Sequence, residues 1–208
     1  MKVLVTLRED VCTKHGELQV SVARPLIALL REMALTPILA VDSSDYFIDL
    51  LYDDSCAGLL LTGGGDPLIG SKRTDSEYLL IEHALNSDSC ITGICRGMQV
   101  INCFFGGAFS VEDGHAGTVD QLIWEKLYAN SNSLPRYVNS FHDNVIHRHQ
   151  LASTLQPLAF DYKANVECAY DKKNRVFAVM WHPERPFGGR DWFKKSYLTV
   201  IRNEVLRA

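Results

Sequence analysis

Short apolar runs alternate with segments of helical periodicity along the first half of the chain. Runs typical of buried strands lie at residues 3–7, 37–41, 57–61 and 91–94. Segments with helical spacing of apolar residues lie at 20–33, 45–52, 75–85 and 97–105. Pro25 predicts that the first helix becomes regular near that residue, and Thr74 is a candidate N-cap. This alternation predicts an α/β fold with a mostly parallel central sheet and helices on both faces.

The second half of the chain has a different pattern. Residues 109–150 are polar, rich in histidine and weakly periodic. Apolar runs at 166–170 and 176–180 flank a polar turn at 171–174, which predicts a small antiparallel hairpin. Residues 191–206 have the spacing of a final amphipathic helix. Because no repeat, low-complexity tract or Pro/Ser-rich linker interrupts the pattern, residues 1–208 are predicted to form a single domain.

Composition narrows the classes of function. The chain has 208 residues with 21 Lys and Arg, 25 Asp and Glu and a formal charge of −4, which argues against a nucleic-acid partner. Its apolar runs are far shorter than the roughly 20 residues of a membrane span, and the first is too short for a signal-peptide core. We therefore expect a cytoplasmic protein without a membrane partner. The six cysteines are scattered without a Cys-x-x-Cys pair, which is typical of reduced thiols.

The segment Gly93-Ile94-Cys95-Arg96-Gly97 has the pattern of a nucleophile elbow between a strand and a helix. Glycines two residues before and after Cys95 remove the Cβ atoms that would block a sharp turn. Such a turn exposes the side chain of Cys95 at a helix N-terminus, where the helix dipole favours a thiolate. A plain strand, turn and helix is the alternative, and the placement after an apolar run favours the elbow.

A cysteine nucleophile needs a base, and the base needs a group that orients it. The segment Trp181-His182-Pro183-Glu184 supplies both at the end of an apolar run. In an extended segment Glu184 lies on the same side as His182 and can hold the imidazole tautomer. The run Leu61-Thr62-Gly63-Gly64-Gly65-Asp66-Pro67 exposes backbone N–H groups that, with that of Arg96, could stabilise an oxyanion. The spacing of a phosphate-binding P-loop is absent from it.

These three motifs, at 61–67, 93–99 and 181–184, resemble those of class I (triad) glutamine amidotransferases, which have a flavodoxin-like fold. The resemblance implies that Cys95, His182 and Glu184 form a triad and that Cys95 attacks a γ-glutamyl carbonyl. A glutamyl thioester then forms and is hydrolysed to glutamate. The implied oxyanion hole consists of the N–H groups of Gly63, Gly64 and Arg96, and Gly65 and Gln99 are implied to contact the glutamyl group.

A finer resemblance connects 95–99 and 138–142 with the γ-glutamyl hydrolase branch, which includes γ-glutamyl-γ-aminobutyrate hydrolases. It makes Ser140 and His142 candidates for binding the α-amino and α-carboxylate groups of the substrate. Asp143-Asn144 departs from other members of the branch. The Trp-His-Pro-Glu-Arg motif is similar to that of hydrolases of γ-glutamyl-CDP-amidate in capsule pathways, which gives a substrate hypothesis. Arg185 and Arg190 could bind a phosphate on such a leaving group, or be surface arginines beside a turn.

Two functions remain open. The chain is either a stand-alone hydrolase of a γ-glutamyl amide or a glutaminase subunit that passes ammonia to a separate synthetase, and a homodimer is also open. An inactive scaffold is disfavoured by the intact Cys, His and Glu. We expect no cofactor and no metal ion, because His147 and His149 lack a third ligand and read as a solvated loop. We likewise expect Lys72 and Arg73 to be solvated charges. We expect Cys90 to be a buried thiol.

Overall fold

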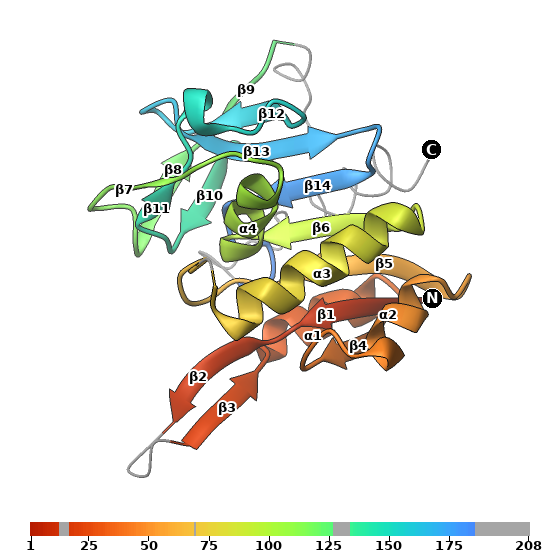
Figure 1. Ribbon diagram of the computed structural model, residues 1–208. Helices are drawn as coiled ribbons and strands as arrows, with labels where there is room; N and C mark the ends of the chain where they lie inside the picture. The colour runs from red at the N-terminus through yellow and green to blue at the C-terminus, as the bar shows by residue number, and fades with distance from the viewer. Residues whose placement is uncertain (13–16, 69, 127–133, 186–208) are drawn as a thin grey trace.

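A computed structural model describes residues 1–12, 17–68, 70–126 and 134–185. Its centre is an eight-stranded sheet with the strand order β4-β1-β5-β6-β14-β13-β12-β9 (Figure 1). The strands of this sheet are β1 (Lys2–Thr6), β4 (Thr36–Ala40), β5 (Cys56–Leu61), β6 (Cys90–Ile94), β9 (Ile123–Trp124), β12 (Gln156–Phe160), β13 (Val166–Asp171) and β14 (Val176–Val179). The five strands from β4 to β14 are parallel to one another, and β13, β12 and β9 continue the sheet in antiparallel pairs. The expected α/β fold with a mostly parallel sheet is confirmed.

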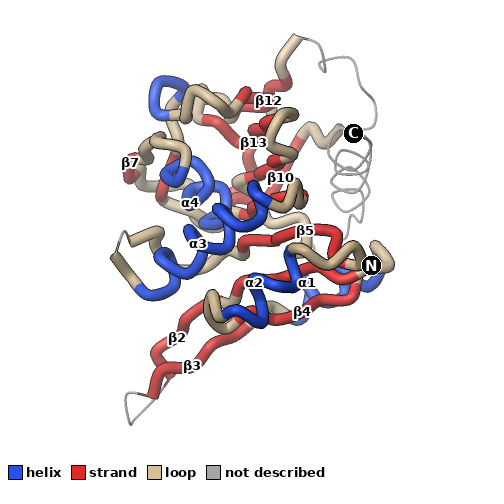
Figure 2. The backbone as a smooth tube through the Cα atoms, turned by 45° about the vertical axis from the view of Figure 1, so that its right-hand side comes forward, coloured by secondary structure: helices blue, strands red, loops and turns tan. Residues whose placement is uncertain are grey.

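Helices cover both faces of the sheet, as the alternation of the sequence predicts (Figure 2). The helices are α1 (Arg24–Glu32), α2 (Asp45–Leu51), α3 (Lys72–Asn86) and α4 (Arg96–Phe104), with a 3-10 turn at Arg148–Gln150. α1 packs with Val3 and Val5 in one buried cluster, whereas α2, α3 and α4 pack with Leu4 in another. Neighbouring residues of β1 therefore point into opposite cores. Burial on both faces explains why the parallel strands read as continuous apolar runs.

Two helix starts differ in detail from the sequence prediction. α1 begins at Arg24, with Pro25 in its first turn as expected, but Val20 lies in a strand that pairs with β2. α3 begins at Lys72, three residues before the predicted start, and its N-cap is Ser71. The hydroxyl of Ser71 accepts the backbone N–H of Thr74, so the prediction of Thr74 as the cap is wrong. Thr74 is instead buried on the inner face of the helix.

Short strands lie near the N-terminus and in the region 109–150 that lacks periodicity. They form three small two-stranded sheets outside the central sheet: β2 (Arg8–Cys12) with β3 (Glu17–Ser21), β8 (Thr118–Gln121) with β10 (Tyr137–Ser140), and β7 (Ser110–Val111) with β11 (Asn144–Val145). Strands of two to five residues are too short to give a periodic signal. The predicted hairpin of 166–170 and 176–180 is confirmed as β13 and β14. The predicted helix at 191–206 and Arg190 lie outside the described residues.

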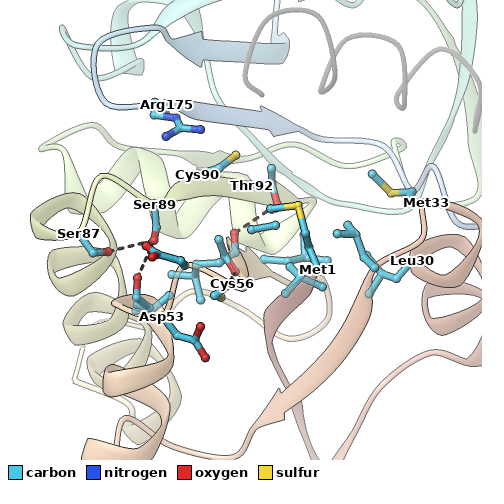
Figure 3. Close-up of a pocket in the computed structure, with 18 of the residues that line it drawn as sticks. Met1, Leu30, Met33, Asp53, Cys56, Ser87, Ser89, Cys90, Thr92 and Arg175 are labelled. Carbon is cyan, nitrogen blue, oxygen red and sulfur yellow. Dashed lines mark hydrogen bonds between the residues drawn. The ribbon is translucent and has the colours of Figure 1, made fainter. Parts of the chain in front are cut away.

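An apolar cavity of about 700 Å³ lies where α1 faces the sheet, near the starts of the parallel strands (Figure 3). Its described lining includes Met1, Leu30, Met33, Cys90 and Arg175. Neither Cys95 nor His182 is among these lining residues, so this cavity is separate from the residues that the motifs single out. Among the described residues, no helix combines the length and apolar character required to cross a bilayer.

Candidate active site

Cys95 lies at the sharp turn between β6 and α4, as the elbow pattern predicts, but the expectation of an exposed side chain is wrong, because Cys95 is 6% exposed. Its backbone has φ 53° and ψ −111°, and its N–H donates to the carbonyl of Val179 at 2.8 Å. A Cβ on Gly97 would lie 2.2 Å from the carbonyl oxygen of Leu61, and one on Gly93 would lie 2.7 Å from Ile101. Both flanking glycines are therefore required by close packing. Cys95 is placed directly before the first turn of α4, at the positive end of the helix dipole.

His182 is hydrogen-bonded on both sides. Its Nδ1 lies 2.7 Å from Oε1 of Glu184, and its side chain also forms a hydrogen bond with Cys95. Burial opposes the protonated ring, but the hydrogen bonds and negative charges of Cys95 and Glu184 outweigh it and raise the pKa of His182 to about 9. The structure thus brings together the three side chains that the motifs predict. A chain of thiol, imidazole and carboxylate suits proton transfer to and from the sulfur.

Asn139 fixes the segment that carries His182. Its side-chain Oδ1 accepts the backbone N–H of His182 at 2.8 Å, and its Nδ2 donates to the carbonyl of the same residue at 2.9 Å. The amide is 1% exposed, so both bonds are shielded from water. Sequence reasoning included Asn139 in a motif but assigned it no role, because a contact 43 residues away leaves no local signal.

Two buried arginines bind backbone carbonyls of residues 61–67, here called the glycine loop. Arg73 donates to the carbonyls of Gly64 at 2.7 Å and Thr62 at 3.0 Å, and Arg96 donates to that of Asp66 at 3.2 Å. Glu77 forms ion pairs with both guanidinium groups and is 1% exposed. With its carbonyls bound on this side, the loop is fixed in place. The interpretation of Arg73 as a solvated charge is wrong, because it pairs with Glu77 at the i, i+4 spacing; Lys72 is exposed.

The glycine loop approaches the triad closely. A Cβ on Gly63 would lie 2.7 Å from Cε1 of His182 and 3.4 Å from Cβ of Cys95. Gly64 and Gly65 have φ values of 91° and 73°, a left-handed conformation that favours glycine. The loop therefore lies beside the sulfur, and its N–H groups and that of Arg96 remain the predicted oxyanion hole.

A pocket of about 310 Å³ opens at Cys95 and His182. Its other walls come from the glycine loop, α4 and the segment after β10. The remaining lining residues are Arg8, Gly64, Gly65, Asp66, Gln99, Phe141, His142, Asp143, Asn144 and Arg185. Gln99 and Asn144 are joined by hydrogen bonds at 3.4 Å in both directions. The structure thus gathers Gly65, Gln99 and His142 of the predicted glutamyl contacts around one cavity.

Ser140 lies behind that wall rather than in it. Its side chain is fully buried, and its hydroxyl is 3.1 Å from Nε2 of His142. Burial lowers the pKa of His142 to about 4, so its ring is neutral at pH 7. The rings of His147 and His149 stack on each other at 5.5 Å, away from the pocket lining.

Comparison with known proteins identifies the family. The model of the glutamine amidotransferase class-I family matches residues 19–194. The chain belongs to this family. The family assignment agrees with the resemblance of the three motifs. The chain is also similar in fold to a solved glutamine amidotransferase of Thermotoga maritima. That structure matches with a TM-score of 0.59 at 13% identity, covering 99% of this chain and 84% of the other.

Curated relatives are similar at modest identity. A γ-glutamyl-CDP-amidate hydrolase of Campylobacter jejuni is 29% identical over 150 residues, covering 69% of this chain and 70% of the relative. The glutamine amidotransferase-like protein YvdE of Lactococcus lactis is also 29% identical over 150 residues, but the match spans only 61% of its length and 65% of this chain. One component of a glutamine-hydrolysing GMP synthase from Methanococcus maripaludis is 24% identical over 148 residues, covering 71% of this chain and 75% of the relative.

Proposed function

We propose that the protein hydrolyses the C–N bond of a γ-glutamyl amide through a glutamyl thioester on Cys95. The observation that carries this proposal is the hydrogen-bonded chain of Cys95, His182 and Glu184 at the pocket. Membership of the glutamine amidotransferase family supports it, and the similarity to a γ-glutamyl-CDP-amidate hydrolase favours hydrolysis as the outcome.

The proposed first step forms the thioester. His182 takes the thiol proton, and the sulfur of Cys95 attacks the γ-carbonyl carbon of the substrate. The carbonyl oxygen becomes an oxyanion, which accepts hydrogen bonds from backbone N–H groups of the glycine loop and Arg96. When this intermediate collapses, the C–N bond breaks and the imidazolium of His182 gives its proton to the departing nitrogen. Glu184 stabilises the imidazolium throughout because it is hydrogen-bonded to Nδ1.

The second step releases glutamate. His182, neutral again, takes a proton from a water molecule that attacks the thioester carbon. A second oxyanion forms at the same N–H groups, the C–S bond breaks, and the sulfur regains its proton from His182. We assign the contacts with the glutamyl group to Gly65, Gln99 and the neutral ring of His142. Ser140 acts on this group through His142, to which it is hydrogen-bonded.

Arg185 favours an anionic leaving group. It lines the pocket beside Cys95, and its guanidinium lies 4.6 Å from the centroid of the Phe141 ring. This stacking holds the planar group at the rim, where its Nε lies 3.7 Å from Oε1 of Glu184 and its side chain is 34% exposed. We assign its terminal N–H groups to a phosphate of the leaving group. A nucleotide phosphoramidate such as γ-glutamyl-CDP-amidate is therefore the substrate class that we propose first.

The test is a screen of γ-glutamyl compounds by the purified chain, read as free glutamate. It includes glutamine, γ-glutamyl-γ-aminobutyrate and a γ-glutamyl nucleotide phosphoramidate. We expect turnover of at least one γ-glutamyl amide, with the highest kcat/KM for the anionic leaving group. Cys95→Ala should lower kcat by a factor of about 10³ or more and leave the circular dichroism spectrum unchanged. Near-normal turnover by that variant would refute the mechanism.

A second candidate function is that of a glutaminase subunit. The similarity to one component of a GMP synthase favours it, because that relative belongs to a glutamine-hydrolysing synthase. The two functions differ in their response to a partner. Hydrolysis of free glutamine that rises strongly only when a synthetase is added would favour the glutaminase role, whereas rapid turnover of γ-glutamyl amides by the chain alone favours the hydrolase.

A further inference from the structure

A second cluster of functional side chains lies behind the pocket wall. It combines Asp120 of β8, His142 from the segment after β10 and Glu167 of β13. One donor atom from each residue lies within 4.8 Å of the other two, and Nε2 of His142 is 3.6 Å from Oε1 of Glu167. All three residues are at most 5% exposed. The cluster is therefore buried, and His142 is the member that also lines the pocket.

The acceptors of this cluster lack donors. Both carboxylate oxygens of Glu167 and Oδ2 of Asp120 are buried without a hydrogen-bond partner. Among the described residues, neither carboxylate forms an ion pair with a lysine or arginine. The hydroxyl of Ser140 carries one proton and contacts both His142 and Asp120, so it can donate to only one of them. Buried acceptors left in this way cost free energy unless a ligand satisfies them.

His142 has the orientation of a metal ligand. Its Nδ1 lies 3.0 Å from the carbonyl oxygen of Asn144, so Nδ1–H donates there. Nε2 is then left with its lone pair among the carboxylates. A ligating histidine typically donates its other ring N–H to a backbone carbonyl in this way. The ring of His115 stacks on that of His142 at 5.6 Å and fixes its plane.

We propose that Asp120, His142 and Glu167 bind one divalent transition-metal ion, with Zn²⁺ as the ion that suits the donor set best. Two carboxylate oxygens and one imidazole nitrogen match the ligands of zinc and balance its charge. Ligand atoms of a tetrahedral zinc with bonds of about 2.0–2.1 Å lie about 3.3 Å apart, close to the 3.6 Å between His142 and Glu167. The hydroxyl of Ser140 or a water completes the coordination.

The ion would act as a positioning group for the neighbouring pocket. It would join β8, β13 and the segment that follows β10. That segment carries Phe141, whose ring lies 5.9 Å from that of His182, and it directly follows β10, in which Asn139 holds the backbone of His182. No ligand of the ion is a member of the triad, so zinc binding is measured without turnover, although His142 also lines the proposed substrate pocket.

Zinc titration by calorimetry tests the proposal, after metal removal with a chelator. The parent for all measurements is Cys95→Ala, since the Cys95 and His182 pair would itself bind zinc. We expect one equivalent of Zn²⁺ per chain and a rise in Tm of about 5 °C or more at a hundredfold excess over Kd. Glu167→Gln and Asp120→Asn should each weaken binding by at least about tenfold. Their metal-free forms should remain folded, because a neutral amide replaces an unpaired carboxylate.

Two control variants exclude other sites. Glu112→Gln removes a carboxylate that is bonded to His115 but lies outside the cluster, and should bind zinc like the parent. The double variant His147→Gln/His149→Gln should also retain zinc. The proposal is overturned if the parent binds no stoichiometric zinc, if Glu167→Gln and Asp120→Asn bind it unchanged, or if only the double variant loses it.

Discussion

Cys95 is held in a conformation that few residues other than glycine adopt. A positive φ at such a residue costs on the order of 1–3 kcal/mol and persists only where the surroundings enforce it. Here the carbonyl of Val179 fixes the N–H of Cys95, and the bare Cα atoms of Gly93 and Gly97 allow the turn. Burial raises the pKa of Cys90 to about 12 and keeps it a thiol at neutral pH.

The pKa of His182 predicts the alkaline limit of activity. Because the imidazolium must protonate the departing nitrogen, kcat/KM should fall as pH rises through about 9. Glu184 helps to raise that pKa, so Glu184→Gln should shift the alkaline limb to lower pH as well as reduce kcat. Measurement of kcat/KM between pH 6 and 10 for both proteins checks this. An unshifted limb in the variant would contradict the role of Glu184.

The same shift has a consequence for stability. The pKa of His182 is raised above the value of 6.5 expected for an unfolded chain, so its protonation stabilises the folded state fully below pH 6.5. That contribution is lost as pH rises through about 9.

At the scale of elements, the site depends on the close approach of α4 to β5. Gly97 in the first turn of α4 faces the end of β5, where the carbonyl of Leu61 leaves no room for a methyl group. The glycine loop begins directly after this strand. A change in the distance between the helix and the strand therefore moves Cys95 relative to the loop.

Gly97→Ala tests this contact. The added Cβ would lie 2.2 Å from a backbone oxygen, so α4 must shift, and we expect a loss of about 1–3 kcal/mol in unfolding free energy together with a large fall in kcat. Urea unfolding and the glutamate assay measure the two effects. Gly114→Ala is the control, because a Cβ there meets open space and only the positive φ of 93° is strained. Equal effects in both variants would contradict the packing argument.

At the scale of the whole molecule, Glu77 joins parts that are far apart in sequence. It accepts hydrogen bonds from Thr6 at the end of β1, from Arg73 on its own helix and from Arg96 at the start of α4. Through the two arginines it also holds the glycine loop. One buried carboxylate thus forms ion pairs with two buried cations beside the site.

Glu77→Gln removes that charge and leaves both guanidinium groups buried without compensation. We expect a loss of about 3–5 kcal/mol in unfolding free energy, measured by denaturant titration. Asp75→Asn on the exposed side of the same helix is the matched control and should change stability by less than about 0.5 kcal/mol. A loss of similar size in both variants would show that the network contributes no special stability.

The sequence alone determined the parts of this protein whose causes are local. The apolar runs of β1, β5 and β6 predicted the parallel sheet, because a strand buried on both faces must be continuously apolar. Paired glycines around Cys95 and the short spacing of His182 and Glu184 predicted the elbow and the hydrogen-bonded pair, because both arise within five residues of chain. Family membership of the chain was recognised from the same motifs.

Only the tertiary structure decided which distant residues meet. The clamp of Asn139 on His182, the burial of Arg73 and the meeting of Asp120, His142 and Glu167 all depend on how separate strands and helices are placed. Strands of two to five residues in the polar second half carry no periodic signal. Contacts across dozens of residues leave no trace in local spacing, and so the residues that support the site became visible only once the chain was folded.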